Sequence, residues 1–78
     1  MKVRVLIRLK PGVLDAQGRA IGNALGDLGY DAVTNVRVGK LIELEVGETD
    51  PAKVQSLVRE ACEKLLANPV IETFSIET

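Results

Sequence analysis

The sequence predicts an α+β fold of the ferredoxin-like type, a βαββαβ two-layer sandwich in which a four-stranded antiparallel sheet carries two helices on one face. Four segments place apolar residues at every second position, as half-buried strands do, and two segments repeat them at helical spacing. The order is strand, helix, strand, strand, helix, strand. The 78 residues suffice for one domain, which we expect to span residues 1–78.

The first strand is predicted over residues 2–10 and the first helix over residues 16–28. The strand is apolar on one face, and its other face is charged except at Leu6. Asp15 is placed to cap the helix by accepting a backbone N–H bond, and Gly29 ends the helix. The apolar face of the helix, which we expect to pack on the sheet, consists of Leu14, Ile21, Ala24, Leu25 and Leu28.

Three glycines, Gly18, Gly22 and Gly26, recur at four-residue spacing beside that apolar face. Each glycine inside a helix costs about 1 kcal/mol relative to alanine, so three of them require an offsetting benefit. One interpretation is a flat contact surface for another subunit. The alternative is tolerated glycine on a solvated face.

Residues 33–46 are predicted to form a β-hairpin against which the other elements pack. Gly39 is expected to adopt a positive φ in the turn, because it has no Cβ to clash there, and Lys40 is expected near the tip. The residues expected on the core face are Ala32, Thr34, Val36 and Val38 of the first strand and Ile42, Leu44 and Val46 of the second.

The second helix is predicted to begin at Pro51, with Asp50 as its N-cap. It is expected to end at Asn68, in a left-handed conformation, because Pro69 prevents continuation. Its buried face is expected to consist of Val54, Leu57, Val58, Ala61 and Leu65, and Val70, Phe74 and Ile76 are expected to point inward along the last strand.

The sheet face without helices is predicted to be a self-association surface, since it mixes charges with apolar residues that one chain leaves uncovered. Its members are Arg4, Leu6, Arg8, Leu41, Glu43, Glu45 and Ile71. Glu43 and Glu45 lie opposite a basic strand, so a cross-strand charge ladder explains them better than a catalytic pair of carboxylates.

Composition and charge exclude several function classes. The net charge of −1 gives no electrostatic reason to expect a nucleic acid or an acidic membrane as partner. No segment is apolar enough over sufficient length for a signal peptide or a membrane span, so we expect a cytoplasmic protein. Without histidine and with Cys62 as the single cysteine, the chain has no usual general base and no metal cluster, and Cys62 is expected in the core.

One further turn is a candidate ligand site. Gly12, in the sequence Lys-Pro-Gly-Val-Leu-Asp, could approach a phosphate or carboxylate near the start of the first helix. Asp15 would compete for the same N–H groups, and an ordinary turn is the alternative.

Three segments, in this order and in a chain of this length, resemble the PurS family, the small subunit of phosphoribosylformylglycinamidine (FGAM) synthase. They are Leu9-Lys-Pro-Gly-Val-Leu-Asp-Ala-Gln-Gly, Val36-Arg-Val-Gly-Lys-Leu-Ile-Glu-Leu and Cys62-Glu-Lys-Leu-Leu-Ala-Asn-Pro-Val-Ile-Glu. The resemblance covers nearly the whole chain, with Ala16 standing where the family often has proline.

The resemblance implies a non-catalytic adaptor in purine biosynthesis, within a complex that has FGAM synthase activity (EC 6.3.5.3). The partners would be the ATP-dependent synthetase subunit PurL, which uses ATP and Mg, and the glutaminase subunit PurQ; this chain would bind no cofactor and would form a dimer or tetramer. Candidates for the partner interface, taken from the matched segments and the glycine stripe, are Pro11, Gly12, Asp15, Gln17, Gly18, Gly22, Gly26, Arg37, Gly39, Lys40, Asn68 and Pro69.

An alternative from a different class is a ligand-sensing module like the ACT domain, which has the same order of elements and a Pro-Gly-x-Leu turn before its first helix. Such modules bind amino acids at that turn.

Overall fold

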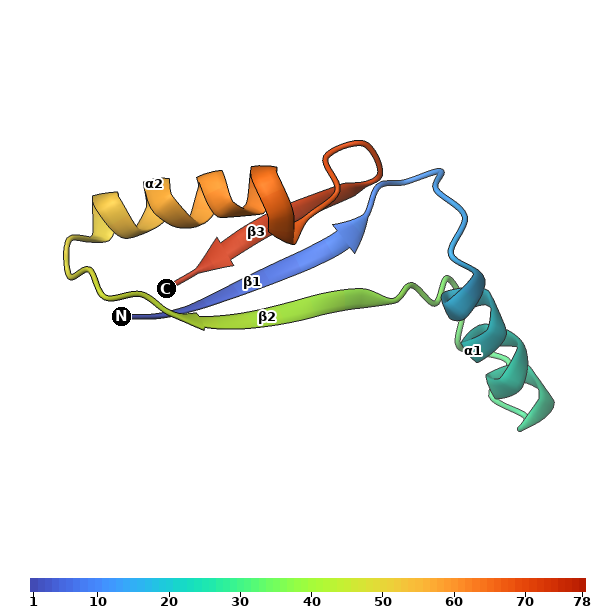
Figure 1. The fold of residues 1–78 in the computed structure, drawn as a ribbon. Coiled ribbons are helices and arrows are strands. Elements are labelled where there is room, and N and C mark those ends of the chain that lie inside the picture. Colours follow the sequence, from blue (N-terminus) through green and yellow to red (C-terminus); the bar gives the residue numbers. More distant parts are fainter.

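Strand β1 (Lys2–Leu9) lies in the middle of a three-stranded antiparallel sheet, between β2 (Gly39–Glu45) and β3 (Glu72–Glu77). The computed structural model describes residues 1–78. Arg4 lies opposite Glu43 on β2 and Glu77 on β3. The chain measures 49 × 23 × 14 Å, and its length comes from a helical arm that extends away from the sheet (Figure 1).

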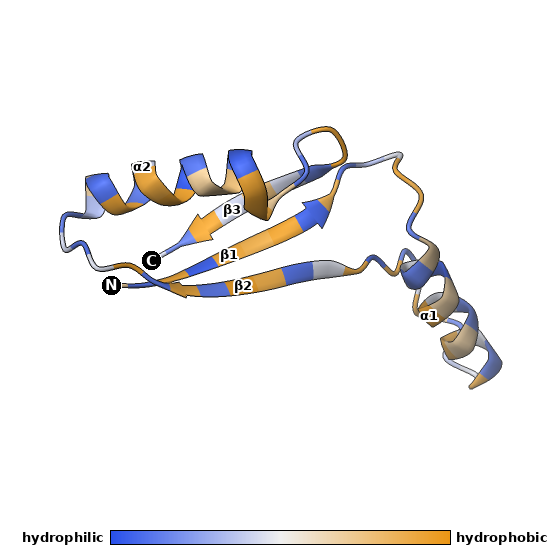
Figure 2. Cartoon of the chain, in the orientation of Figure 1, coloured by the Kyte–Doolittle hydropathy of each residue, from blue (hydrophilic) through white to orange (hydrophobic).

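One helix covers the sheet. Helix α2 (Pro51–Ala61) continues into the π-helical turn η1 (Cys62–Leu66), and Figure 2 shows hydrophobic residues on β1 and on the sheet side of α2. Between them lies a core of seven buried apolar residues, Val3, Val5, Ile7, Val54, Val58, Cys62 and Ala67. None of the helices is both long and apolar enough to cross a membrane.

Three of the four local signals for helix ends are confirmed. Asp15 accepts a bond from the N–H of Gly18 at 2.8 Å, and Asp50 accepts one from Ala52 at 3.0 Å with Pro51 in the first turn. Helix α1 (Ala16–Asp27) ends where Gly29 takes φ +92°, and the N–H of Tyr30 donates to the Leu25 carbonyl. This pattern is a Schellman motif, which satisfies carbonyls that the last turn leaves free.

The predicted four-stranded sheet is not confirmed, because residues 33–38 pair with no strand. The predicted hairpin over residues 33–46 therefore does not form. The prediction that α1 packs on the sheet is also wrong for this chain (Figure 1). Gly39 lacks a positive φ and instead continues the chain into β2, opposite Arg8. A Cβ on Gly39 would lie 2.6 Å from the Ile7 carbonyl oxygen, so glycine is needed for the close approach of β1.

Three smaller predictions also fail. Lys40 is not at a hairpin tip but within β2, opposite Ile7. Leu57 and Leu65 are 52% and 83% exposed, because α2 contacts the sheet along the narrower line of Val54, Val58 and Cys62. Asn68 is not left-handed: the helix ends when Ala67 becomes extended, and the Asn68 side chain accepts a bond from the N–H of Val70 at 3.0 Å.

Candidate functional site

The three segments that carry the family resemblance meet at one end of the sheet. Lys10, which leaves β1, donates its backbone N–H to the Ile71 carbonyl at 2.8 Å and its ammonium to the Pro69 carbonyl at 2.9 Å. These bonds hold the turn before β3 against the turn after β1. The segment before β2 joins them through Arg37, whose Nη2 donates to the Lys10 carbonyl at 3.3 Å.

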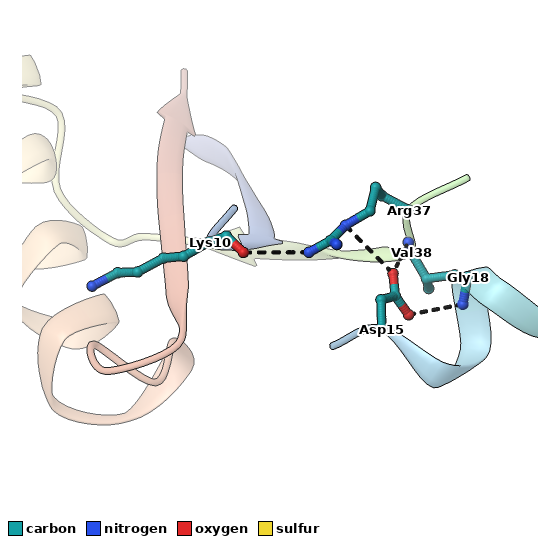
Figure 3. Close-up of polar contacts among 5 residues, drawn as sticks. All are labelled: Lys10, Asp15, Gly18, Arg37 and Val38. Carbon is teal, nitrogen blue, oxygen red and sulfur yellow. Dashed lines mark hydrogen bonds and ion pairs between the residues drawn. The ribbon is translucent and has the colours of Figure 1, made fainter. Parts of the chain in front are cut away.

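Asp15 holds the start of α1 to the segment before β2 (Figure 3). Its Oδ1 accepts the N–H of Gly18, and its Oδ2 accepts the N–H of Val38 at 2.7 Å. The guanidinium of Arg37 lies 3.8 Å from the same Oδ2. The backbone bonds from Val38 and Gly18, aided by the charge of Arg37, hold the pKa of Asp15 below its usual value.

A second ion pair crosses the sheet. The ammonium of Lys40 on β2 reaches over β1 to Glu72 on β3, at 3.3 Å from Oε2. The other oxygen of Glu72 accepts the N–H of Asn68 at 2.8 Å. This backbone bond and the Lys40 charge lower the pKa of Glu72. The sequence did not single out Glu72, because nothing in its spacing shows that Lys40 lies two strands away.

A cleft of about 900 Å³ opens between the end of β1 and the segment that enters β2. It is lined by five partner-interface candidates and three self-association candidates: Pro11, Gly12, Arg37, Gly39, Lys40, Leu6, Arg8 and Leu41. Asn35 also lines it and is the one non-glycine residue with positive φ, at 56°. The cationic side chains of Arg8, Arg37 and Lys40 give the cleft a positive charge.

The other partner-interface candidates do not line this cleft. Gln17, Gly26 and Pro69 are exposed, and Gly22 is half-buried in ordinary contact with the Val36 side chain. The need for glycine at position 18 is explained within the chain, since a Cβ there would lie 2.5 Å from the Val36 carbonyl oxygen. The contact-surface interpretation of the stripe therefore rests on Gly22 and Gly26.

The helix-free face of the sheet groups the self-association candidates of the two strands. Leu6 lies opposite Leu41, and Arg4 lies between Glu43 and Glu77 in the register. Residues two apart on a strand share a face, so Arg8 and Glu45 belong to the same surface. Ile71 lies outside the strands, in the turn before β3, and is 37% exposed.

The ionised groups at this end bind backbone groups or each other. Asp15 and Glu72 accept backbone N–H bonds, the side chains of Lys10 and Arg37 donate to backbone carbonyls, and Lys40 pairs with Glu72. No three His, Cys, Asp or Glu side chains are grouped so that they could hold a metal ion. Cys62 is fully buried, as expected, and burial raises the pKa of its thiol. A buried thiol with a raised pKa is a poor nucleophile.

Comparison with known proteins matches this geometry to one family. The sequence profile of PurS, described as phosphoribosylformylglycinamidine (FGAM) synthase, matches residues 2–78. The FGAM synthase subunit PurS of Bacillus subtilis is 47% identical over 76 residues, which are 97% of this chain and 89% of that protein.

Solved structures of the same family share the shape. The PurS of Methanocaldococcus jannaschii, one of the subunits of formylglycinamide ribonucleotide amidotransferase in the purine biosynthetic pathway, superposes with a TM-score of 0.87 at 45% identity, covering 97% of this chain and 92% of that one. A chain of PurLQS from Thermotoga maritima gives 0.89 at 33% identity, covering 97% and 93%. These matches extend over α1 as well as the sheet, and none supports the ACT-like alternative. The chain belongs to the PurS family.

Proposed function

We propose that this chain is the adaptor subunit of an FGAM synthase (EC 6.3.5.3), holding a PurL-type synthetase and a PurQ-type glutaminase together in purine biosynthesis. The observation that carries the proposal is the match, over 97% of the chain, to a chain of the Thermotoga maritima PurLQS structure. The site agrees with such a role, because its charged groups fix segments of backbone and leave no activated nucleophile.

The reaction gives an adaptor a physical purpose. Formylglycinamide ribonucleotide, glutamine and ATP become formylglycinamidine ribonucleotide, glutamate, ADP and phosphate. Ammonia released by the glutaminase must reach the activated amide in the synthetase before it is protonated or lost. A subunit that fixes the two enzymes relative to each other raises the effective concentration of ammonia at the second site.

Two surfaces are candidates for the contacts that an adaptor needs, the cleft beside β1 and the helix-free face of the sheet. Arg37 and Lys40, 45% and 58% exposed at the side chain, line the cleft together with Pro11 and Gly12, and they are the candidates for contacts with PurL or PurQ. The helix-free face around Leu6 and Leu41 is the candidate for self-association into a dimer or tetramer. No cofactor is assigned to this chain; ATP and Mg belong to the synthetase. A cytoplasmic location remains a prediction.

Mixing the purified chain with its PurL and PurQ subunits tests the proposal. We expect the three to co-elute on size exclusion, and we expect Gly22→Leu to weaken co-elution while keeping the fold. Ala20→Leu, at an exposed position of the same helix, is the matched control. Separate elution of all three proteins, with substrates present and absent, would contradict the adaptor role. Unchanged co-elution of Gly22→Leu would remove Gly22 from the interface only.

A further inference from the structure

The cleft between the end of β1 and the segment that enters β2 differs in charge from the rest of the chain. The whole sequence has 11 acidic and 10 basic residues. The 12 residues that line the cleft include Arg8, Arg37 and Lys40 and no aspartate or glutamate. A cleft lined by one sign of charge raises the local concentration of ions of the opposite sign. This cleft therefore favours an anion, although the chain as a whole does not.

The three cationic side chains are not equally available to a ligand. Lys40 is paired with Glu72 at 3.3 Å. Arg37 donates one N–H to the Lys10 carbonyl and directs its Nε toward Asp15 (Figure 3), which leaves three of its five N–H donors. Arg8 is exposed and belongs to none of the three ion pairs of the chain. Arg8 and Arg37 are therefore the groups that can bind an anion.

The strand register explains why the charge of Arg8 is not compensated. Arg4, on the same face of β1, lies between two glutamates, whereas Arg8 lies between Gly39 and Thr73. The Cγ of Arg8 is 3.7 Å from the position that a Cβ of Gly39 would occupy, so glycine leaves room there for the arginine side chain. Arg37 precedes Gly39 by two residues, a Cα separation of at most about 7 Å. One anion in the cleft is within reach of both guanidinium groups.

We propose that the cleft binds a small organic phosphomonoester, such as a sugar phosphate or a mononucleotide, with its phosphate group between Arg8 and Arg37. A guanidinium presents parallel N–H donors that match phosphate oxygens, and a phosphomonoester carries close to two negative charges at pH 7. The inference rests on the charge and the size of the cleft and does not depend on the adaptor function.

The size and the walls of the cleft suit the uncharged body of such a ligand. Its volume of about 900 Å³ lies within the range of about 300–1,000 Å³ that is typical of small-molecule sites. Leu6 and Leu41, which lie opposite each other on β1 and β2, line it and offer apolar surface to a carbon skeleton. Asn35 also lines it, and its amide provides both donors and an acceptor for hydroxyl groups.

Calorimetric titration of the isolated chain with ribose 5-phosphate, in about 0.1 M sodium chloride, tests the proposal. We expect saturable binding of one ligand per chain. Arg8→Gln and Arg37→Gln should each weaken it about tenfold or more, because each removes charge-assisted hydrogen bonds. Arg8→Gln is the decisive variant, since Arg37 also binds the Lys10 carbonyl.

Arg4→Gln is the matched control. It removes the same charge from the same face, but Arg4 does not line the cleft. It lies four residues from Arg8, roughly 13 Å along the strand, which exceeds the Debye length of about 10 Å at this salt concentration. Its affinity should therefore stay within about twofold of the wild type. An equal loss for Arg4→Gln and Arg8→Gln would show general charge attraction and overturn the proposal.

Ribose and inorganic phosphate test the two parts of the ligand separately. Ribose should not bind, because it has no charge for the arginines. Inorganic phosphate should bind more weakly than ribose 5-phosphate, because it leaves the apolar walls and Asn35 without contacts. Equal affinities for the two phosphates would contradict an organic ligand, and no saturable binding of ribose 5-phosphate up to about 10 mM would overturn the site itself.

Discussion

At the scale of single residues, Asp15 has more roles than its position before a helix predicts. The N-cap was predicted from sequence because capping is local: a carboxylate three residues before a free N–H is sufficient. The bond to Val38 was not predicted, because it joins residues 23 positions apart. The same limit applies to Lys40 and Glu72, whose ion pair depends on the order of the strands.

Asp15→Asn is expected to destabilise the fold near neutral pH. An asparagine has one oxygen and one NH₂ group, so it can accept from Gly18 or from Val38 but not from both as the carboxylate does. The measurement is the urea midpoint at pH 7 and one fixed chain concentration. Asp50→Asn is the matched control, because asparagine serves equally well as an N-cap with a single acceptor bond.

The pH dependence of that difference follows from the lowered pKa of Asp15. A carboxyl group whose pKa is lower in the folded state contributes stability above its unfolded pKa, about 3.9, and loses it as the pH falls through the folded value. The gap between wild type and Asp15→Asn should therefore be constant from pH 7 to pH 5 and should narrow below about pH 4. A gap that widens in acid would contradict this account of Asp15.

At the scale of elements, the alternation of apolar residues predicted the strands that pair in the sheet. Residues 2–9 form a strand as expected, and the last strand begins only at Glu72, so Val70, which was expected to point inward, is 77% exposed in the turn before it. Residues 33–38 have the same alternation but no partner, since a pattern specifies which face is apolar and not which strand lies beside it. The hairpin prediction failed at Gly39, where glycine is required by the contact with Ile7 rather than by a turn.

Two adjacent residues of β1 separate folding from assembly. Ile7 is buried under α2 and Leu6 points to the helix-free face. Ile7→Ala is expected to cost about 2–5 kcal/mol in the free energy of unfolding. Leu6→Ala should cost clearly less, because Leu6 is half-buried, and should weaken self-association instead. Urea unfolding and light scattering on both variants measure this; a larger stability loss for Leu6→Ala would contradict the assignment of the two faces.

At the scale of the whole molecule, the family could be recognised from three short segments, and the structure shows that those segments meet at one end of the sheet. The extended shape could not be predicted. Leu14, Ile21 and Leu28 have the spacing of a helix that packs on a sheet, and nothing in that spacing shows that α1 extends away from the sheet (Figure 1). Lys10 and Arg37 explain how the arm and the sheet are joined.

The adaptor role predicts that FGAM synthesis depends on this chain when glutamine is the nitrogen source and not when free ammonia is. If the chain only holds two enzymes in position, synthesis from glutamine requires it, whereas synthesis from a high concentration of free ammonia proceeds in the synthetase alone. Arg37→Ala and Lys40→Ala should reduce the glutamine-dependent rate when the subunit is limiting, because exposed charges at an interface mainly affect association. Excess protein should restore that rate.

The most direct test is a pair of rate curves for FGAM formation against the concentration of this chain, one with glutamine and one with ammonium salt. The account predicts that the glutamine curve rises from near zero to a plateau, shifted to higher concentration for Arg37→Ala and Lys40→Ala, while the ammonium curve is flat. An ammonium-dependent rate that also requires the chain, with variants that saturation does not rescue, would place one of these residues in the chemistry and contradict the adaptor role.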